Sequence, residues 1–377
     1  MAPAPTFMEF FAGGGMARLG LEGWRCLYAN DLDPMKARAY AENFGAGHLV
    51  QADVWSLGPD SVPSPVDLAW ASPPCQDLSL AGQRAGLSAR RSGAFWGFHR
   101  LIKALSRQGR APTTVVIENV TGLLTSNGGA DFAALCEALA DLGYRVGALE
   151  ADAALWSAQS RPRVFVIATR GDPKGLTVED PGPPFHSDRI RTAHARLGSV
   201  AKTAWVWWRL NQPTPPAQRL IDLLEPDAGR RWFTSERTDR LIAQMAPLHR
   251  ERLGQALASG QRTAAAVYRR TRHEDGRRVQ RAEARFDGRA GCLRTPAGGS
   301  SRQFVLVIEE GGVRARLLTA REAARLMGLP DAYRLPASEQ AALKLVGDGV
   351  SPHVVAALNR DILLPLARGH GAERQAG

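Results

Sequence analysis

Four side chains suited to catalysis lie near the ends of apolar segments that are typical of buried strands. Cys75 lies after two prolines and before a polar tail, in the segment SPPCQDLS. Glu118 stands near the end of TTVVIENV, and Arg161 and Arg163 alternate in QSRPRV, so an extended backbone would point both to one side. A thiol, a carboxylate and guanidinium groups on one rim are suited to nucleophilic catalysis. Taken alone, Cys75 is better explained as a small buried residue. The four groups together favour a reactive site.

The elements that must position these side chains are alternating strands and helices. Strands are expected at residues 6–11, 24–31, 66–72, 113–120, 145–156 and 163–170, with a short one before Asp53. Helices are expected at residues 16–23, 34–44 and 131–144. This alternation predicts an α/β, doubly wound, parallel sheet with helices on both faces. The carboxyl ends of its strands would then share one edge.

A glycine cluster and two acids indicate a nucleoside pocket at that edge. Gly13 opens a run of three glycines after the first strand, where the backbone can approach a ligand closely. Asp31 ends the second strand 18 positions later and is placed to bind ribose hydroxyls. Asp53 follows the third strand and could read an adenine amino group. The glycines do not form GxGxxG and the chain has no GxxxxGK[ST], which argues against nicotinamide, flavin and phosphate-loop chemistry.

Composition favours a cytoplasmic protein with a polyanionic partner. The net charge is +11, and arginines gather between residues 229 and 289, although an arginine-rich genome could also raise the charge. The four cysteines form no metal-ligand spacing, so we expect a reduced compartment and no metal. No run of roughly 18 apolar residues and no signal peptide is seen, so we expect no membrane partner.

Two features mark the middle of the chain. Trp205, Trp207 and Trp208 in WVWWRLNQ could stack on bases or form the core of a small domain, and we favour the core. The stretch YRRTRHEDGRRVQRAEARF predicts a basic hairpin with EDG at its turn. Its arginines could contact phosphates or guanine edges.

The ordered series FFAGGG, YANDLD, ADV, PPCQDLS, ENV, QSRPR, RLLTAREAARLMGLPDAY and GDGVSP resembles the DNA (cytosine-5) methyltransferases of bacteria and phages. The resemblance covers roughly residues 7–170 and 288–365. It implies a catalytic and cofactor-binding domain at 1–170 and a smaller target-recognition domain at 171–287. Residues 288–368 would end the recognition region and return closing helices to the first domain. We expect a disordered tail at 369–377.

The resemblance also implies the chemistry. Cys75 would add to carbon 6 of a flipped-out cytosine in double-stranded DNA, and Glu118 would share a proton with ring nitrogen 3. Arg163 would hold the exocyclic oxygen, and Arg161 would position the nucleophile loop or a phosphate. Carbon 5 would then take the methyl group of S-adenosylmethionine, leaving S-adenosylhomocysteine.

Binding roles follow from matching positions. The cofactor would be bound by Phe11, Ala12, Gly13, Gly15, Asp31, Leu32, Asp53, Val54, Pro73, Gly349 and Val350. DNA would be bound by Gln76, Ser79, Gln159, Arg269, Arg270, Arg272, Arg277 and Arg278. We expect a monomer that acts in the bacterial nucleoid, alone or with a cognate restriction endonuclease.

Four positions depart from the family pattern. Glu9 replaces the usual aspartate, Met16 a glycine, Leu32 an aromatic residue and Asp348 an asparagine. Asp348 could favour the ammonium of the cofactor's amino-acid end, disfavour its carboxylate, or simply cap the next helix. We expect Asp348→Asn to change cofactor affinity by several-fold. Cofactor titration of both proteins checks this, and equal affinities would contradict it.

Three other functions remain open at this point. A related tRNA-modifying enzyme is disfavoured by the long variable region and its hairpin. A catalytically silent DNA-binding module is disfavoured by Cys75, Glu118 and Arg163 occurring together. Transfer of a modified group from an altered cofactor is suggested only by Asp348.

Overall fold

The computed structural model describes residues 3–74, 93–214, 216–226, 231–274, 276–294 and 302–369. The chain divides into two compact units. Unit 1 comprises Met1–Asp152, Pro162–Gln212 and Val350–Gly377, and unit 2 comprises Ala153–Arg161 and Pro213–Gly349. Residues 171–212, which we expected in the recognition domain, therefore cluster with unit 1. The expected disordered tail lies outside the described residues from residue 370 onwards.

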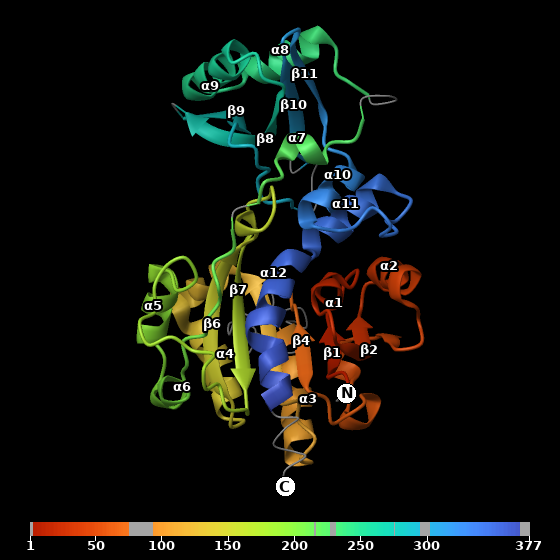
Figure 1. The fold of residues 1–377 in the computed structure, drawn as a ribbon, viewed down its shortest axis with the longest axis vertical. Coiled ribbons are helices and arrows are strands. Elements are labelled where there is room, and N and C mark those ends of the chain that lie inside the picture. The colour runs from red at the N-terminus through yellow and green to blue at the C-terminus, as the bar shows by residue number, and fades with distance from the viewer. Residues whose placement is uncertain are drawn as a thin grey trace. The chain divides into compact units, whose positions relative to one another are not determined.

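Unit 1 contains a seven-stranded sheet (Figure 1). Its strands are β1 (Thr6–Phe10), β2 (Arg25–Asp31), β3 (Leu49–Gln51), β4 (Leu68–Ala71), β5 (Thr114–Val120), β6 (Arg145–Asp152) and β7 (Pro162–Thr169). They lie in the order β3-β2-β1-β4-β5-β7-β6, as the doubly wound α/β class predicts. Strand order reverses between β1 and β4, and ligands of such sheets bind outside the strand ends at this point. The expected cofactor and nucleophile segments both leave the sheet there.

The sheet is mixed rather than wholly parallel, which corrects one expectation. β7 runs antiparallel to both β5 and β6. Only residues 153–161 connect β6 to β7, and a parallel crossover needs a dozen or more residues. The short connection therefore forces the antiparallel return.

Helices cover the sheet of unit 1. They are α1 (Met16–Gly20), α2 (Pro34–Phe44), α3 (Ala94–Arg107), α4 (Ala130–Ala140), α5 (Asp188–Ala195), α6 (Ser199–Thr203) and α12 (Pro352–Leu358), which continues into a π-helical turn, η9 (Asn359–Leu363). α3 and α4 bury apolar side chains against one face, together with Met8, Phe10 and Ile117. The sequence analysis had not identified α3.

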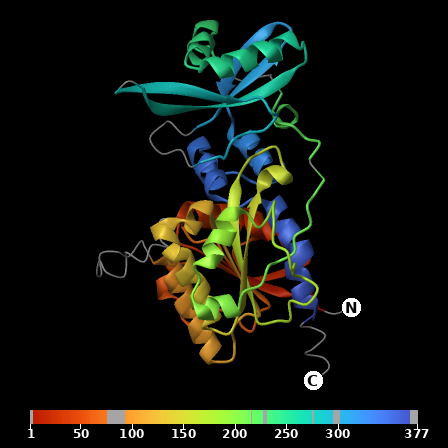
Figure 2. The same cartoon turned by 90° about the vertical axis from the view of Figure 1, so that its left-hand side faces the viewer.

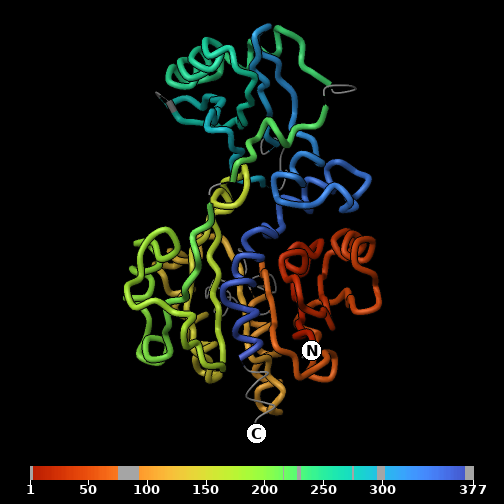
Figure 3. Tube along the Cα trace, in the orientation of Figure 1, coloured from red at the N-terminus to blue at the C-terminus, as the bar shows by residue number. Residues whose placement is uncertain are grey.

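The C-terminal helix packs on the first helix, as the family resemblance implied. Figure 3 shows the blue α12 running beside the red N-terminal segment. The contact is close because Gly20 has no side chain, and a Cβ there would lie 2.5 Å from Val355 Cβ. Trp24 Nε1 also donates to Asn359 Oδ1 at 2.7 Å. Residues more than three hundred positions apart thus complete one unit.

The three tryptophans belong to unit 1, which corrects their expected place in a recognition domain. The backbone beside Trp205 pairs with the edge of β6, where Val206 N donates to Val146 O at 2.9 Å. Trp208 is fully buried and donates to Ile167 O at 3.1 Å. Trp205 and Trp207 pack against the core. Their role in the structure is to cover an edge strand.

Unit 2 is built on a four-stranded antiparallel sheet (Figure 2). Its strands are β8 (Thr263–Glu274), β9 (Arg277–Arg285), β10 (Phe304–Glu309) and β11 (Gly312–Leu317), in the order β11-β10-β8-β9. Its helices are α7 (Leu220–Leu223), α8 (Ser235–Ala243), α9 (Pro247–Ala258), α10 (Ala320–Met327) and α11 (Glu339–Asp348). The predicted basic hairpin is confirmed as β8–β9, with Glu274 paired to Arg277 at the turn.

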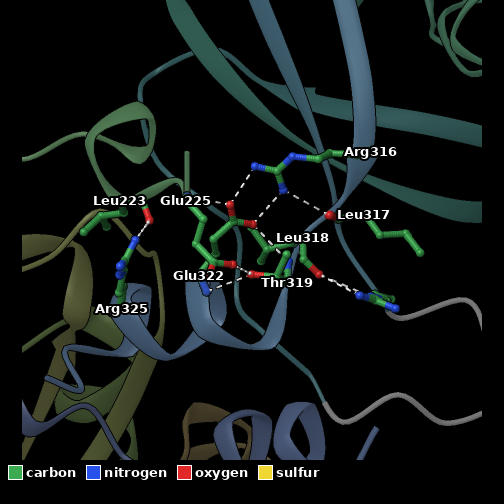
Figure 4. Close-up of polar contacts among 9 residues, drawn as sticks. Leu223, Glu225, Arg316, Leu317, Leu318, Thr319, Glu322 and Arg325 are labelled. Atoms are coloured by element: carbon green, nitrogen blue, oxygen red, sulfur yellow. Dashed lines mark hydrogen bonds and ion pairs between the residues drawn. The ribbon is translucent and has the colours of Figure 1, made fainter. Parts of the chain in front are cut away.

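A buried ion pair joins β11 to α10 in unit 2 (Figure 4). Arg316 donates to both carboxylate oxygens of Glu322, at 2.8 and 2.6 Å, and both side chains are almost fully buried. The backbone N–H groups of Thr319 and Glu225 also donate to Glu322, each at 2.9 Å. The same Thr319 and Glu322 form the capping box of α10. One carboxylate thus fixes a strand, a helix start and a distant loop.

The stretch Glu339–Gly369 is long and apolar enough, by composition, to pass as a membrane-spanning helix. Its mean hydropathy reaches 1.2, and 61 % of the most apolar window is buried inside the protein. Packed core helices show the same pattern, so this composition does not by itself argue for a membrane span.

Candidate active site

The turn after β1 leaves open space where a ligand is expected. Phe11, Gly13 and Gly15 all have positive φ angles, of 56°, 57° and 74°. A Cβ on Gly15 would lie 2.4 Å from the Phe44 ring, whereas a Cβ on Gly13 would meet nothing within 4 Å. The turn therefore packs against the Phe44 ring at Gly15, whereas it has open space at Gly13. The positive φ of Phe11 gave no signal in the sequence.

Asp31 fixes this turn. Its Oδ2 accepts from Gly13 N and its Oδ1 from Asp33 N, both at 2.8 Å. Burial raises the pKa of its carboxyl group. Leu32, directly after it, is 62 % exposed.

The remaining predicted cofactor residues of unit 1 lie on neighbouring segments. Ala12 is buried, and its N–H donates to Asn30 O at 2.9 Å. Asp53 is exposed and caps the short helix η1 (Val54–Ser56) by accepting from Trp55 N at 2.9 Å. Val54 is buried beneath it. An open glycine turn, a buried carboxylate, an exposed leucine and an exposed acid fit a nucleoside cofactor.

The segment that leads to the nucleophile is held in place up to Pro73. Ser72 N donates to Phe10 O at 3.3 Å, and Trp70 Nε1 donates to Ser72 Oγ at 3.0 Å. Asn119 Nδ2 donates to Pro73 O at 3.0 Å. Asn119 was not among the predicted site residues, although the ENV motif contained it. Cys75, Gln76 and Ser79 themselves lie outside the described residues.

Glu118 and Arg163 form an ion pair in unit 1. Glu118 lies opposite Phe165 in the β5–β7 ladder, so Arg163, two positions along, projects from the same face. Arg163 Nε lies 3.0 Å from Glu118 Oε1, and their side chains are only 13 % and 9 % exposed. The antiparallel return of β7 therefore brings the predicted carboxylate and guanidinium together. Glu118 thus forms the ion pair with Arg163. Asn119, the next residue of β5, binds the segment that leads to the nucleophile.

Arg161 does not join this pair, which corrects the expectation that both arginines converge. It belongs to unit 2, is 2 % exposed, and donates to three carbonyl oxygens there. These are Leu293 O at 2.9 Å, Gly347 O at 2.8 Å and Gly349 O at 2.6 Å. Arg161 directly precedes one passage of the chain between units, and Gly349 precedes another. Its observed role is to tie segments of unit 2 at these passages.

Two other predicted site residues, Gln159 and Val350, are buried. Gln159, expected to contact DNA, is fully buried, and its amide has no hydrogen-bond partner among the described residues. Val350 is buried as well, and it belongs to unit 1 while Gly349 belongs to unit 2. Asp348 is the exposed last residue of α11, and Ser351 occupies the N-cap position of the following helix without a side-chain capping hydrogen bond.

Glu9, which departs from the family pattern, is a buried acid on β1, the strand that leads into the glycine turn. It is 1 % exposed, and its Oε2 has no hydrogen-bond partner among the described residues. Burial raises its pKa to about 8, against the opposing charge of Arg18. Arg18 is instead hydrogen-bonded through NH1 to Tyr40 OH at 2.9 Å. Glu9 thus holds a proton at neutral pH.

We expect the Glu9 carboxyl to reduce stability as the pH rises. Its folded pKa of about 8 exceeds the ordinary 4.5, so the folded state keeps a proton that the unfolded chain releases between these values. The contribution is present below pH 4.5 and is lost as the pH rises through 8, by up to about 1.4 kcal/mol per pH unit. Urea unfolding at pH 5 and pH 8 should therefore show Glu9→Gln gaining stability relative to wild type at the higher pH. Parallel pH profiles of the two proteins would contradict it.

Comparison with known proteins agrees with this geometry. The family model described as C-5 cytosine-specific DNA methylase matches residues 5–364. The type II methyltransferase M.DsaV of Dactylococcopsis salina is 24 % identical over 368 residues, covering 95 % of this chain and 85 % of the relative. M.HhaI of Haemophilus parahaemolyticus is 26 % identical over 357 residues, covering 93 % and 91 %.

Solved structures share the fold. The S. pombe Dnmt2 methyltransferase aligns with a TM-score of 0.57 at 18 % identity, covering 96 % of this chain and 98 % of that one. The Entamoeba histolytica methyltransferase EhMeth aligns with a TM-score of 0.58 at 14 % identity, covering 96 % and 98 %. At these identities the similarity concerns the fold alone.

Proposed function

Because the chain belongs to the C-5 cytosine-specific DNA methylase family, we propose that it methylates carbon 5 of a flipped-out cytosine in a specific duplex sequence, through a covalent adduct to Cys75. The observation that supports this most is the Glu118–Arg163 pair, because Glu118 lies on β5, the strand next to the one that leads into Cys75, and Arg163 lies on β7, the next strand again. Asn119 ties the two strands by binding Pro73 O. A nucleophile, a proton donor and a cation are thus carried by adjacent segments of unit 1.

The first step makes an unreactive carbon nucleophilic. The Cys75 thiolate adds to carbon 6 of cytosine, and the ring's electron pair moves toward nitrogen 3, which takes a proton from Glu118 once that carboxyl has been protonated in the complex. Arg163, held by its ion pair, binds the exocyclic oxygen and stabilises the developing negative charge. Carbon 5 then has enamine character. A base inside the duplex cannot reach such a site, so it is flipped out at a cost of a few kcal/mol.

The second step uses the cofactor pocket. S-adenosylmethionine supplies an electrophilic methyl group when bound. Asp31 would hold the ribose, Leu32 would lie against the adenine, Asp53 would read the adenine amino group, and Gly13 leaves room for the backbone to approach. With the cofactor bound, carbon 5 would take its methyl group and lose its own proton to water, Cys75 would leave as a thiolate as the double bond reforms, and the nitrogen 3 proton would return to Glu118. We place this activity in the bacterial cytoplasm, alone or beside a restriction endonuclease.

Glu118→Gln tests the proton transfer. An amide cannot deliver a proton to nitrogen 3, so we expect single-turnover methylation to slow by about 10²- to 10⁴-fold with unchanged cofactor affinity. Glu150→Gln is the matched control, because Glu150 is also a buried strand carboxylate paired with an arginine, Arg189. We expect its rate to stay close to wild type. Equal losses in both variants would mean that Glu118 acts only structurally.

The activity itself is tested with S-adenosylmethionine and a mixed DNA pool, followed by base-resolved detection of 5-methylcytosine. Methylation confined to one short sequence supports the proposal. A parallel reaction on tRNA tests whether tRNA, rather than duplex DNA, is the substrate. Methylated tRNA with unmodified DNA would overturn the choice of substrate, and bound cofactor with neither product would overturn the proposed transfer.

A further inference from the structure

The β8–β9 hairpin extends beyond the sheet of unit 2. β8 pairs with β10 only from Thr263 to Val267, whereas its pairing with β9 continues from Ala266 to Glu274. Residues 268–274 and 276–283 therefore form a two-stranded extension past the pairing with β10, visible as the long pair of strands in Figure 2, and we call it the arginine ribbon; at its base Ala282 is buried and bridges Met245. A two-stranded ribbon has the width that the major groove of B-DNA admits.

The ribbon is strongly basic. It carries six arginines against three acids, at positions 269, 270, 272, 277, 278 and 281 and at positions 274, 275 and 283. Arg270 lies directly opposite Arg281, so two guanidinium groups share one face at neighbouring positions. The ribbon therefore carries an excess of positive charge, which attracts a polyanion. The pattern favours a polyanionic partner.

One carboxylate, Glu283, organises the base of the ribbon. Arg272 Nε donates to its Oε1 at 2.9 Å, and Arg270 Nε lies 3.6 Å from its Oε2. Tyr268, opposite Glu283, also hydrogen-bonds to it, and the Arg270 guanidinium lies 4.7 Å from the Tyr268 ring centre. Partial burial raises the pKa of Glu283, but the contacts with Arg272, Tyr268 and Arg270 outweigh it and leave the pKa below its usual value. Two arginines are thus held in fixed positions by one ionised group.

The tip of the ribbon is different. Arg277 and Arg278 are exposed, and the structure gives neither of them an ion pair with a described side chain. Arg277 shares the face of Arg270 and Arg272, and Arg278 lies on the opposite face. Among the described side chains, the ribbon therefore carries two arginines paired with Glu283 near its base and two exposed arginines at its tip.

We propose that Glu283 is a specificity-determining residue, which fixes Arg270 and Arg272 to read base edges while the ribbon lies in the major groove of duplex DNA. This inference rests on the proposed function. Reading guanine needs a guanidinium in a defined plane, and a side chain already held in place loses less entropy on binding. Phosphate contact has no such requirement, so Arg277 and Arg278 bind the backbone and set the salt dependence.

The test uses binding rather than catalysis, so that it stays separate from the methylation assay. A random duplex pool is incubated with the full chain, the bound fraction is sequenced, and affinity is measured against salt. For Glu283→Gln we expect the preference for the wild-type motif over single-base variants to fall about tenfold. For the double variant Arg277→Ala and Arg278→Ala we expect the same motif but a salt slope smaller by about two.

Arg262→Gln is the matched control. Arg262 precedes β8 at the end far from the ribbon tip and is also exposed and paired with a carboxylate, Glu309, at 3.3 Å. Neither motif nor salt slope should change. Arg272→Lys keeps the charge and loses the planar fork, so it should relax the motif even if Glu283→Gln folds poorly.

Three results would overturn the inference. They are an unchanged motif in both Glu283→Gln and Arg272→Lys, a salt slope unaffected by the tip variant, and tighter binding of the wild type to structured RNA than to duplex DNA. If the wild type selects a DNA motif but does not methylate it, the proposed function is contradicted, whereas the role of the arginine ribbon in binding is not.

Discussion

A Cys75→Ser variant is expected to form no detectable 5-methylcytosine, a loss on the order of 10⁴-fold or more in turnover. The serine hydroxyl is not ionised near neutral pH, whereas a thiol supplies a reactive thiolate. Without addition at carbon 6, carbon 5 never gains the electron density that attacks the methyl group. Base-resolved sequencing after incubation with S-adenosylmethionine measures the loss.

The other described cysteines are poor substitutes, so the loss should be complete. Cys136 is fully buried, and burial raises the pKa of its thiol. Burial also raises the pKa of Cys26, whose Sγ lies 3.6 Å from Tyr40 OH. Cys292 belongs to unit 2, where it contacts Arg161. Neither Cys26 nor Cys136 therefore offers a ready thiolate.

A trapping experiment separates nucleophilic attack from mere binding. With 5-fluorocytosine in the target, carbon 5 cannot lose a proton, so the wild type should stay covalently attached to DNA on a denaturing gel. Cys75→Ser should bind the cofactor normally and form no such adduct. Cys26→Ser is the control and should behave as wild type. Methylation that persists in Cys75→Ser would show that the thiol is not the nucleophile.

Much of unit 1 could be predicted from the sequence, because its information is local. Short apolar runs ending in Gly13, Asp31 and Glu118 identify parallel strands and the edge at which they end. Pro34 and the acid before it mark a helix start, and Asp33 indeed caps α2. The β8–β9 hairpin was equally readable from its turn and alternating charges.

The parts that failed depend on contacts between distant segments. Alternation placed Arg161 and Arg163 on one side, yet Arg161 bonds to carbonyl groups almost two hundred positions away, at Gly347 and Gly349. Nothing in WVWWRLNQ indicated that the edge of β6 needed covering. Likewise, the sequence does not indicate which arginines of the ribbon pair with Glu283. That pairing depends on the strand register, which places Glu283 opposite Tyr268 and within reach of Arg272.

Glu322→Gln is expected to destabilise unit 2 by about 3–5 kcal/mol, because it leaves the buried Arg316 guanidinium without a counter-charge. Glu322 is fully buried and accepts four hydrogen bonds, two of them from Arg316 (Figure 4). Burial raises its pKa, but these bonds outweigh burial and leave the pKa below the usual value. The pair's stabilisation is therefore present above the unfolded pKa and is lost on acidification.

Hydrogen exchange of unit 2 peptides measures this effect better than one melting curve, because a chain of two units need not unfold in a single step. Glu339→Gln is the matched control, since Glu339 is half exposed and pairs with Arg302 on the surface, where such pairs are worth about 1 kcal/mol or less. Replacing Arg316 and Glu322 together by Met and Leu should recover much of the loss, because no buried charge then remains unpaired. Equal exchange in Glu322→Gln and Glu339→Gln would mean that packing, rather than the ion pair, holds α10 against β11.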